Sequence, residues 1–396
     1  MKTQLSVIVT FVLMGLSNQA QASIHEGIDT MLSQGKTNGL LRYRYEHVDQ
    51  EGIAEEAHAS TLLTRINYTT GALNGIKAML EVDNVTSIGS ENYNSTVNSM
   101  TDHAVVADPT GTEVNQANLQ YNNQHVSFIL GKQRINLDDQ RFIGGVAWRQ
   151  NEQTFDGYRA IYKGSDKLKV DYSYVYNVNR IFGEQSAASD LRGKLHLGNV
   201  SYQVSQKTAV TGFAYLLDFE SALVISTRTL GMRVSGDVVD NVSYTLSYAS
   251  QQDYGDNPKD FSVDYALAEL KGLVGKVGWT VGYEALGSDN GVGFTTPLAT
   301  AHKFQGFADK FLGTPANGVV DWYVGIRGAV AGIKLGLTYH QFDSQKNDIQ
   351  YGSEIDLTAA YKVSDKCKVL LKYAAYSADE LATDSNKLWF MLSHTF

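Results

Sequence analysis

The chain has 396 residues, a formal net charge of −9 at pH 7, 36 glycines, 23 tyrosines and only 4 prolines. The acidic balance argues against a nucleic-acid partner. The single cysteine, Cys367, excludes an internal disulfide and any metal site built from several thiolates. Cys367 follows a predicted turn, SDK, and is interpreted as a spare thiol whose function the sequence leaves open.

The first residues are typical of an export signal. Lys2 precedes a mostly apolar stretch of about 12 residues, which is shorter than the roughly 20 that a spanning helix needs. The tripeptide AQA at 20–22 has the small-x-small pattern of a signal-peptidase site. Residues 1–22 are therefore predicted to be a signal peptide cleaved after Ala22, and no later segment is apolar enough for a transmembrane helix.

Residues 23–38 differ from the rest of the chain because their apolar positions have helical spacing. Ile24, Ile28 and Leu32 recur every four residues, and Gly35 is suited to end a helix there. This segment is predicted to be a short periplasmic helix before the first strand. Two roles are open for it, a leader outside the pore or a plug within it.

From about residue 39 to the end, the sequence is a series of stretches in which apolar and polar residues alternate. In LLRYRYE, for example, Leu41 and Tyr43 lie on the opposite face from Arg42 and Arg44. A period of two predicts extended strands with one apolar face. The last ten residues, KLWFMLSHTF, continue the pattern to the terminal residue Phe396.

The connections between these stretches alternate between short and long. Short turns of a few residues, such as KGSDK at 163–167, alternate with longer polar loops, and all four prolines fall in the long ones. The long loops are predicted at about 47–59, 86–113, 135–153, 179–190, 218–227, 251–260, 286–320, 343–353 and 377–386. Eight turns and nine loops make eighteen strands, with sixteen as the nearest alternative. Short periplasmic turns and long outer loops are the arrangement of outer-membrane barrels.

A soluble sandwich or propeller is the competing fold, because the alternation does not say which face points outward. Strands of about 10 residues match the 9–11 that a tilted membrane-spanning strand needs. Aromatic residues gather on the apolar face and at its ends, as they do at membrane interfaces. The predicted fold is therefore an all-β, antiparallel, up-and-down transmembrane β-barrel over residues 39–396.

The most specific stretch is GKQRINLDDQRFIGGVAWRQNEQTFDGYRA at 131–160. Its middle, FIGGVAW, is apolar, which a fully solvated outer loop does not need. The loop at about 135–153 is therefore predicted to fold inward and to narrow a pore. The charged residues expected at this constriction are Arg134, Arg141, Arg149, Arg159, Asp138 and Asp139.

Two roles are open for these arginines. Guanidinium groups stay charged and bind carboxylates or phosphates in a bidentate way, so rings of them select anions. Alternatively, Arg141 and Arg149 pair with Asp138, Asp139 or Glu152 and only hold the loop in place.

The stretch GKQRINLDDQRFIG…W…TFDGYR, together with LRYRYEHVDQ near residue 41, resembles alginate-export-type porins, a kind of substrate-specific outer-membrane porin. The resemblance covers the first strand, this hairpin, the alternation and Phe396. It implies an 18-stranded monomeric barrel whose lumen is lined by arginines and passes anionic solutes. It carries these roles to Arg134, Arg141 and Arg159, and less directly to Arg149.

The polar face of the predicted strands carries more basic than acidic residues. The basic residues assigned to the lumen are Arg42, Arg44, Arg65, Lys77, Arg159, Lys169, Lys194, Arg233, Arg327, Lys334 and Lys372. The acidic ones are Glu46, Glu81, Asp83, Asp171, Asp264, Glu284 and Asp356. A basic lumen in an acidic chain favours anions, because a narrow aqueous pore focuses the field.

The predicted function is passive diffusion of small hydrophilic solutes, anions such as carboxylates or acidic oligosaccharides, through an outer-membrane porin. The alternatives are a non-conducting structural or adhesive barrel and an outer-membrane enzyme, although no nucleophile elbow or HExxH motif is present. No cofactor and no metal are predicted. The expected partners are membrane lipid, lipopolysaccharide, the solute and, through Phe396, the barrel-assembly machinery. A monomer is expected, with a trimer as the alternative.

Overall fold

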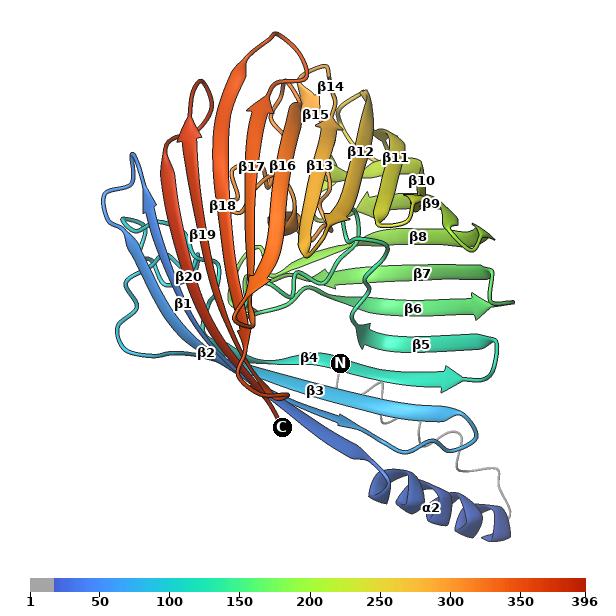
Figure 1. Ribbon diagram of the computed structural model, residues 1–396. Coiled ribbons are helices and arrows are strands. Elements are labelled where there is room, and N and C mark those ends of the chain that lie inside the picture. Colours follow the sequence, from blue (N-terminus) through green and yellow to red (C-terminus); the bar gives the residue numbers. More distant parts are fainter. Residues whose placement is uncertain (1–17) are drawn as a thin grey trace.

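The computed structural model describes residues 18–396, and side chains from His25 onward. It begins with the helix α2 (Asn18–Ser33), and the first strand starts at Lys36. The cleavage point predicted after Ala22 falls inside this helix, and residues 1–17 of the predicted signal peptide lie outside the described residues. The helix ends beside the first turn of the barrel, where the amide of Gly71 donates to the carbonyl of Met31 (2.8 Å), and it projects away from the barrel (Figure 1).

Eighteen antiparallel strands form one closed sheet, as the alternation of the sequence predicts (Figure 1). They are β1 (Lys36–Gln50), β2 (Ala57–Thr69), β3 (Ile76–Ser87), β4 (Gly111–Asn122), β5 (Val126–Gln133), β6 (Thr154–Lys163), β7 (Leu168–Asn179), β8 (Asp190–Ser205), β9 (Thr208–Phe219), β10 (Thr227–Val239), β11 (Val242–Asp253), β12 (Ser262–Val274), β13 (Val277–Leu286), β16 (Val319–Val330), β17 (Ile333–Asp343), β18 (Gln350–Lys362), β19 (Cys367–Ala378) and β20 (Ser385–Thr395). Each strand pairs with its neighbours in sequence, and β20 pairs with β1 to close the barrel. Closure leaves no strand edge without hydrogen bonds, which a lipid-facing sheet requires.

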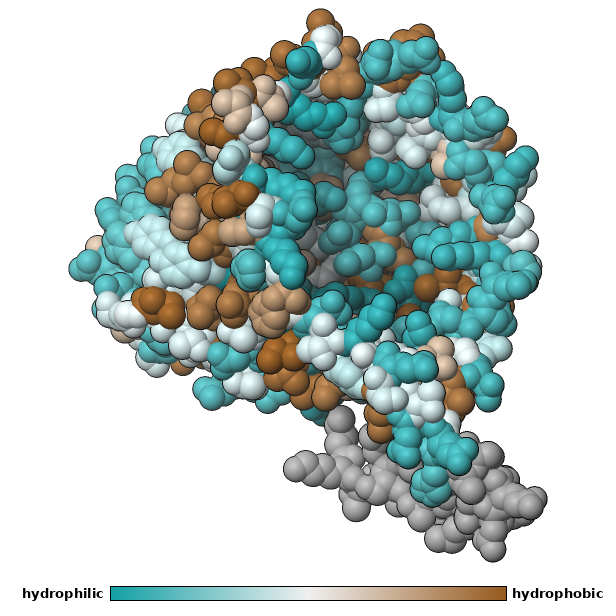
Figure 2. Space-filling model, turned by 60° about the horizontal axis from the view of Figure 1, so that its bottom comes forward, coloured by the Kyte–Doolittle hydropathy of each residue, from teal (hydrophilic) through white to brown (hydrophobic). Residues whose placement is uncertain are grey.

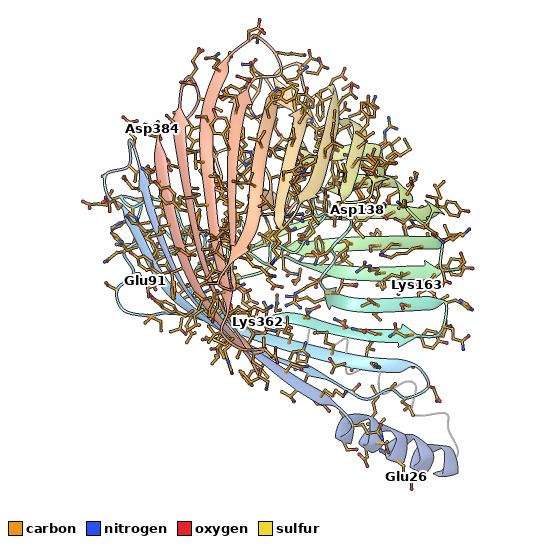
Figure 3. The ribbon with its side chains drawn as sticks, in the orientation of Figure 1. Glu26, Glu91, Asp138, Lys163, Lys362 and Asp384 are labelled. Carbon is orange, nitrogen blue, oxygen red and sulfur yellow. The ribbon has the colours of Figure 1, made fainter. Side chains whose placement is uncertain are left out.

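The short turns lie at one end of the barrel and the long loops at the other. Lys163 and Lys362 mark the turn end, and Glu91 and Asp384 mark the loop end (Figure 3). In the part of the chain that the structure describes, no helix has the length and apolar character to cross a membrane.

The outer wall is covered by apolar side chains. Those at least half exposed include Leu119, Phe128, Tyr158, Met232, Trp322 and Ile326. The opposite face of the same strands carries buried charges, so apolar residues point out and polar residues point in. Figure 2 shows a hollow lined largely by hydrophilic residues and an outer wall with hydrophobic ones. This orientation suits a bilayer outside and water inside, and it rules out the sandwich, in which apolar faces meet in a dry centre.

The end of the 88–110 connection reaches into the barrel at Asp108, while two long connections fold into it over their whole length: 134–153 and 287–318. The last of these contains a small hairpin, β14 (Ser288–Asp289) and β15 (Val292–Gly293), and the 3-10 turn η2 (Ala301–Lys303). A second 3-10 turn, η1 (Leu223–Ile225), lies between β9 and β10. The interpretation of 286–320 as a polar outer loop is wrong, because Phe294 and Leu298 are completely buried inside the barrel.

Candidate functional site

The connection 134–153 folds inward because its apolar residues find a packing surface inside the barrel. Ile135, Leu137 and Ile143 are buried in the main core cluster. Ile143 forms a parallel bridge with Leu298 of the 287–318 connection, and the amide of Gly144 donates to the carbonyl of Leu298 at 2.8 Å. The two connections therefore act as one internal layer across the lumen, in which the apolar part of FIGGVAW is the contact surface.

Arginines on β1 anchor the tip of this loop. Arg42 donates through Nε to Gln150 Oε1 (2.9 Å) and through Nη1 to the carbonyl of Ala147 (2.9 Å). Arg44 donates to the carbonyl of Trp148, and its guanidinium lies 4.3 Å from the centre of that ring. Both arginines lie inside the barrel, as the alternation predicts, but they are buried and bind the loop.

Arg149 is enclosed by carboxylates from three parts of the chain. Its Nη1 lies 2.9 Å from Glu46 Oε2 and 3.8 Å from Asp108 Oδ2, and its Nη2 lies 3.6 Å from Asp309 Oδ2. Burial opposes the charge on Arg149, but these three carboxylates together hold its pKa above the ordinary value. A buried charge with this many partners has a structural role, since it fixes the loop to β1 and to both other inward connections.

Arg141 is equally buried and lies on the opposite side of the loop. Its Nε donates to Glu284 Oε1 of β13 at 2.7 Å, and its Nη2 donates to Gln305 Oε1 at 3.1 Å. The partners expected for Arg141 and Arg149 were Asp138, Asp139 and Glu152. In the structure both arginines instead pair with acidic groups outside their own loop, so they join the loop to the wall.

Three further basic residues form ion pairs where the loop leaves and re-enters the wall. Glu152 accepts hydrogen bonds from both Arg65 (2.6 Å) and Arg134, and Arg159 pairs with Asp171 at 2.7 Å. These guanidinium groups are less buried than Arg141 or Arg149, and Arg134 keeps 25% of its side-chain surface exposed. Of the predicted constriction arginines, Arg134 is the one most open to the lumen.

A polar cavity of about 360 Å³ lies between the inward connections and the wall. Its lining residues are Asp139, Arg233, Leu267, Glu269, Lys271, Thr280, Glu284, Lys303, Phe304, Gln305, Gly306, Phe307, Asp321, Tyr323, Gly325, Ile326, Arg327, Gly336, Thr338, His340 and Asp356. Asp139 lines the cavity and forms an ion pair with Arg233. Asp138, labelled near the centre of Figure 3, instead accepts from Asn199 Nδ2 at 2.8 Å, and burial raises its pKa.

The carboxylates of this cavity have basic partners. Glu269 pairs with Lys271 at 2.6 Å, Glu284 pairs with Arg141, and Asp321 pairs with His340 at 3.0 Å. Asp356 lies 3.7 Å from the same histidine.

Two cations at the cavity have no such partner. Within residues 25–396, Lys303 and Arg327 form no ion pair, and Lys303 Nζ donates only to the carbonyl of Asp139 (2.9 Å). Lys303 and Arg327 are therefore the lining cations whose charge is not matched by a carboxylate among the described residues.

A cluster of aromatic rings and titratable groups supports the loop, and of its members outside the loop only Lys372 was assigned to the interior from the sequence. Trp148 stacks on His302 at a centroid distance of 4.4 Å, and Lys372 Nζ lies 2.8 Å from His302 Nε2. His302 Nδ1 is 2.7 Å from Asp309 Oδ1. Burial lowers the pKa of His302 to about 3, although Asp309 acts in the opposite direction. Apolar residues within 286–320 were the one signal that this connection folds inward.

The remaining residues assigned to the lumen are placed as follows. Lys77 shares the inner face of β3 with Glu81 and Asp83. Lys194 and Asp264 are on the other face: Lys194 is 64% exposed, and its neighbours on either side along β8 are buried inside. The assignment fails for these two because apolar residues occupy the inner face of this part of β8 and β12, so the polar face of the sequence pattern is the outer one there.

No protein-family model matches the chain, and no curated protein matches it in sequence. Solved structures match its fold over nearly the whole length. OccAB4 of Acinetobacter baumannii has a TM-score of 0.74 at 12% identity, covering 93% of this chain and 99% of its own. The outer membrane protein OpdK of Pseudomonas aeruginosa has 0.72 at 13%, covering 92% and 99%. OpdK solved with vanillate has 0.72 at 14%, with the same coverage.

These likenesses establish the fold: a closed 18-stranded barrel of the kind found in substrate-specific outer-membrane porins. The finer resemblance to alginate-export-type porins is not supported by these comparisons, since the similar structures are Occ and Opd channels. In the structure, the buried arginines and the apolar centre of the hairpin motif hold the loop inside the barrel.

Proposed function

We propose that this chain is an outer-membrane channel through which small hydrophilic solutes, preferentially small carboxylates, diffuse passively. The single observation that carries the anion preference is the charge balance of the lumen cavity. Its carboxylates have basic partners, while Lys303 and Arg327 have no acidic ones among the described residues. Unpaired cations in a narrow polar passage attract anions and replace part of their hydration.

The inward layer supports a channel that selects its solutes rather than a wide pore. The connection 134–153, held by Arg44, Arg141 and Arg149, occupies the cross-section between β1 and β13. We propose that it sets the narrowest part of the passage. The partly exposed side chain of Arg134 beside Glu152 would meet a solute that passes there.

The solved neighbours support carboxylates as the class of solute. One of them is OpdK in complex with vanillate, an aromatic carboxylate. Vanillate is therefore a reasonable first probe for this chain, alongside aliphatic carboxylates of similar size.

The test is the reversal potential of the purified channel in a planar bilayer under a tenfold KCl gradient. The expected sign is that of an anion-selective channel, and added vanillate is expected to reduce the current in a concentration-dependent way. A cation-selective reversal potential would refute the anion preference. A folded barrel without conductance would favour the alternative of a structural or adhesive barrel.

We also propose that the barrel acts as a monomer in contact with lipid and lipopolysaccharide. The terminal residue is suited to recognition during assembly: Phe396 donates to the carbonyl of Gly39 at 3.1 Å, while its side chain stays 53% exposed. Deletion of Phe396 is expected to lower the yield of folded barrel in cells. The molar mass of the purified protein in detergent, corrected for bound detergent, is expected to be that of one chain.

A further inference from the structure

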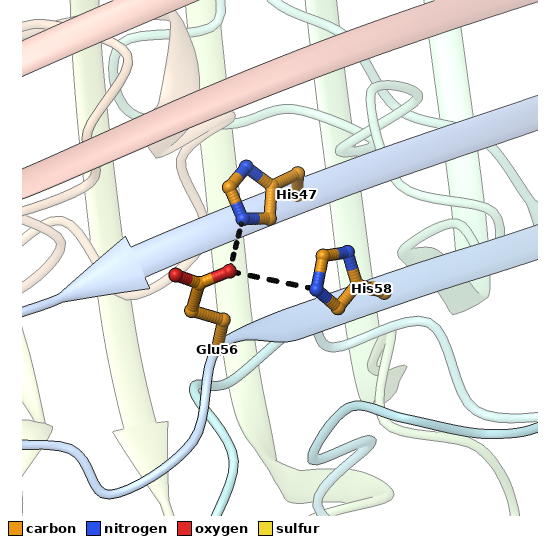
Figure 4. Close-up of side chains that lie close together, drawn as sticks. All are labelled: His47, Glu56 and His58. Atoms are coloured by element: carbon orange, nitrogen blue, oxygen red, sulfur yellow. Dashed lines mark hydrogen bonds and ion pairs between the residues drawn. The ribbon is translucent and has the colours of Figure 1, made fainter.

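Three side chains at the loop end of the first hairpin point their donor atoms toward one another on the outside of the barrel (Figure 4). His47 on β1 and His58 on β2 are direct cross-strand partners, and Glu56 precedes β2 by one residue. His47 Nε2 lies 2.9 Å from Glu56 Oε2, and His58 Nε2 lies 3.5 Å from the same oxygen. This cluster is separate from the lumen, because His47 and His58 alternate with the inward residues Glu46, Val48 and Ala57.

We propose that His47, Glu56 and His58 form a binding site for a divalent transition-metal ion of the zinc type. Two imidazole nitrogens and one carboxylate oxygen are a common set of ligands for Zn²⁺, with a fourth position left to water or another donor. The ligand atoms lie within 4.8 Å of one another. With bond lengths of about 2.0–2.2 Å, ligand atoms around a tetrahedral ion are separated by about 3.4 Å, so small side-chain movements suffice.

The backbone already organises the two histidines. Their rings stack with a centroid distance of 4.7 Å and an interplanar angle of 17°, so both Nε2 atoms face the Glu56 carboxylate. Strand pairing fixes their Cα positions, and little ordering is left for the ion to impose. Sites carried on strands are held more firmly than sites carried on flexible loops alone.

Neighbouring groups orient the ligands in the way known for metal sites. The Tyr45 hydroxyl lies 2.9 Å from His58 Nδ1 and can accept its proton, which leaves the lone pair of Nε2 free for an ion. His103 Nδ1 lies 2.7 Å from the carbonyl of Glu56, so the 88–110 connection holds the backbone of the carboxylate ligand. The connection between β1 and β2 also carries Glu51 and Glu55, whose charges favour a cation.

The access of the site is consistent with loading from outside the cell. The side chains of His47, His58 and Glu56 are 27%, 45% and 52% exposed. An ion there would join β1, β2 and the connection between them close to the seam where β1 meets β20. Metal binding is therefore expected to stabilise the closing hairpin, because it ties two strands and their loop together.

Calorimetric titration of the untagged, folded barrel in detergent with ZnCl2, after treatment with a chelator, tests the proposal. One ion per chain is expected. Substitution of either ligand, H47A or H58A, is expected to weaken binding at least tenfold, and the H47A/H58A double variant is expected to abolish it. Cu²⁺ bound to the wild-type chain should show two nitrogen ligands in electron paramagnetic resonance, and one in each single variant.

His196→Ala is the matched control. His196 also lies on the outer face of its strand, β8. Its Nδ1 also lies close to a tyrosine hydroxyl, that of Tyr172 at 2.8 Å. H196A should bind zinc like the wild type, and C367S should do so too, which excludes the lone thiol as the ligand. Saturable binding that survives in H47A/H58A, or a wild-type barrel that binds no zinc, would overturn the proposal. Heat-dependent migration in detergent gels confirms that each variant is folded.

Discussion

Two sets of basic side chains face the interior of this barrel, and they differ in burial and in partners. Arg44, Arg141 and Arg149 are buried and each forms an ion pair with a buried carboxylate. Lys303 and Arg327 line the open cavity and have no ion-pair partner among residues 25–396. The buried arginines therefore hold the structure together, whereas the charges of the two cavity residues are not used by an ion pair.

This difference changes how an arginine-rich motif in a barrel is interpreted. A guanidinium that is fully satisfied by carboxylates has no donors left for a solute, whereas an unpaired cation in water retains its field. The motif at 131–160 marks a loop that folds into the lumen and packs there. The groups that a solute would meet are contributed mostly by other segments.

Arg149→Ala should have the largest effect on stability. The substitution leaves Glu46, Asp108 and Asp309 buried without their shared cation. Removing one partner from a buried ion pair destabilises by about 3–5 kcal/mol. We expect the 134–153 connection to leave the lumen, so single-channel conductance should rise and become noisy while the wall of the barrel remains intact.

Arg192→Ala is the control for this prediction. Arg192 pairs with Asp190 at 2.8 Å but is 73% exposed, and exposed pairs contribute about 0–1 kcal/mol. Conductance equal to that of the wild type is expected. If Arg149→Ala also conducts like the wild type, the buried arginines do not hold the loop.

Gly144→Ala should weaken the contact between the two inward connections. A Cβ atom at Gly144 would overlap Thr300 Oγ1 and lie 2.8 Å from Gln140 Cβ. Overpacking of this kind costs about 1–3 kcal/mol. Faster proteolysis within 134–153 is expected. Gly313→Ala, where a Cβ meets nothing within 4 Å, is the control, and equal proteolysis of both variants would show that the contact is loose.

Stability should fall with pH below about 6.5 because of His302. Burial holds the pKa of His302 at about 3, below its value in an unfolded chain, so the unfolded state takes up a proton first. The free energy of unfolding should therefore decrease as pH falls from 6.5 toward 3, with a slope that approaches about 1.4 kcal/mol per pH unit. Urea unfolding in lipid vesicles measures this slope, and His302→Gln should flatten it. An unchanged slope in this variant would assign the effect to another group.

The fold could be predicted from the sequence because a membrane barrel repeats one local rule. Alternation along each strand and the spacing of turns depend only on near neighbours, so the eighteen strands and their direction are confirmed. The side of the wall on which the tyrosines and leucines lie is also confirmed, but it was inferred from strand length and the position of the aromatic residues, since alternation alone does not give it.

The partners inside the barrel could not be predicted, because they are distant in sequence. Arg141 meets Glu284, and Trp148 meets His302, only after the whole barrel has closed. Lys194 was assigned to the wrong face because this part of β8 turns apolar residues, such as Leu195, toward the interior. Burial was the missing quantity: it separates Arg149, which holds the loop, from Arg327, which does not.

Arg327→Gln should have the smallest effect on stability and the most specific effect on transport. Arg327 lies on β16 at the cavity and has no ion pair to lose, so unfolding should change by less than about 0.5 kcal/mol. Its removal takes one of the two unpaired cations from the cavity, so the reversal potential should move toward zero. Lys303→Gln should shift it in the same direction, and the double variant should shift it further, because the two charges act on the same solute.

Arg228→Gln is the control, since Arg228 is exposed on β10 and does not line the cavity. If Arg149→Ala changes selectivity while Arg327→Gln and Lys303→Gln leave it unaltered, the division between structural and solute-facing cations is incorrect.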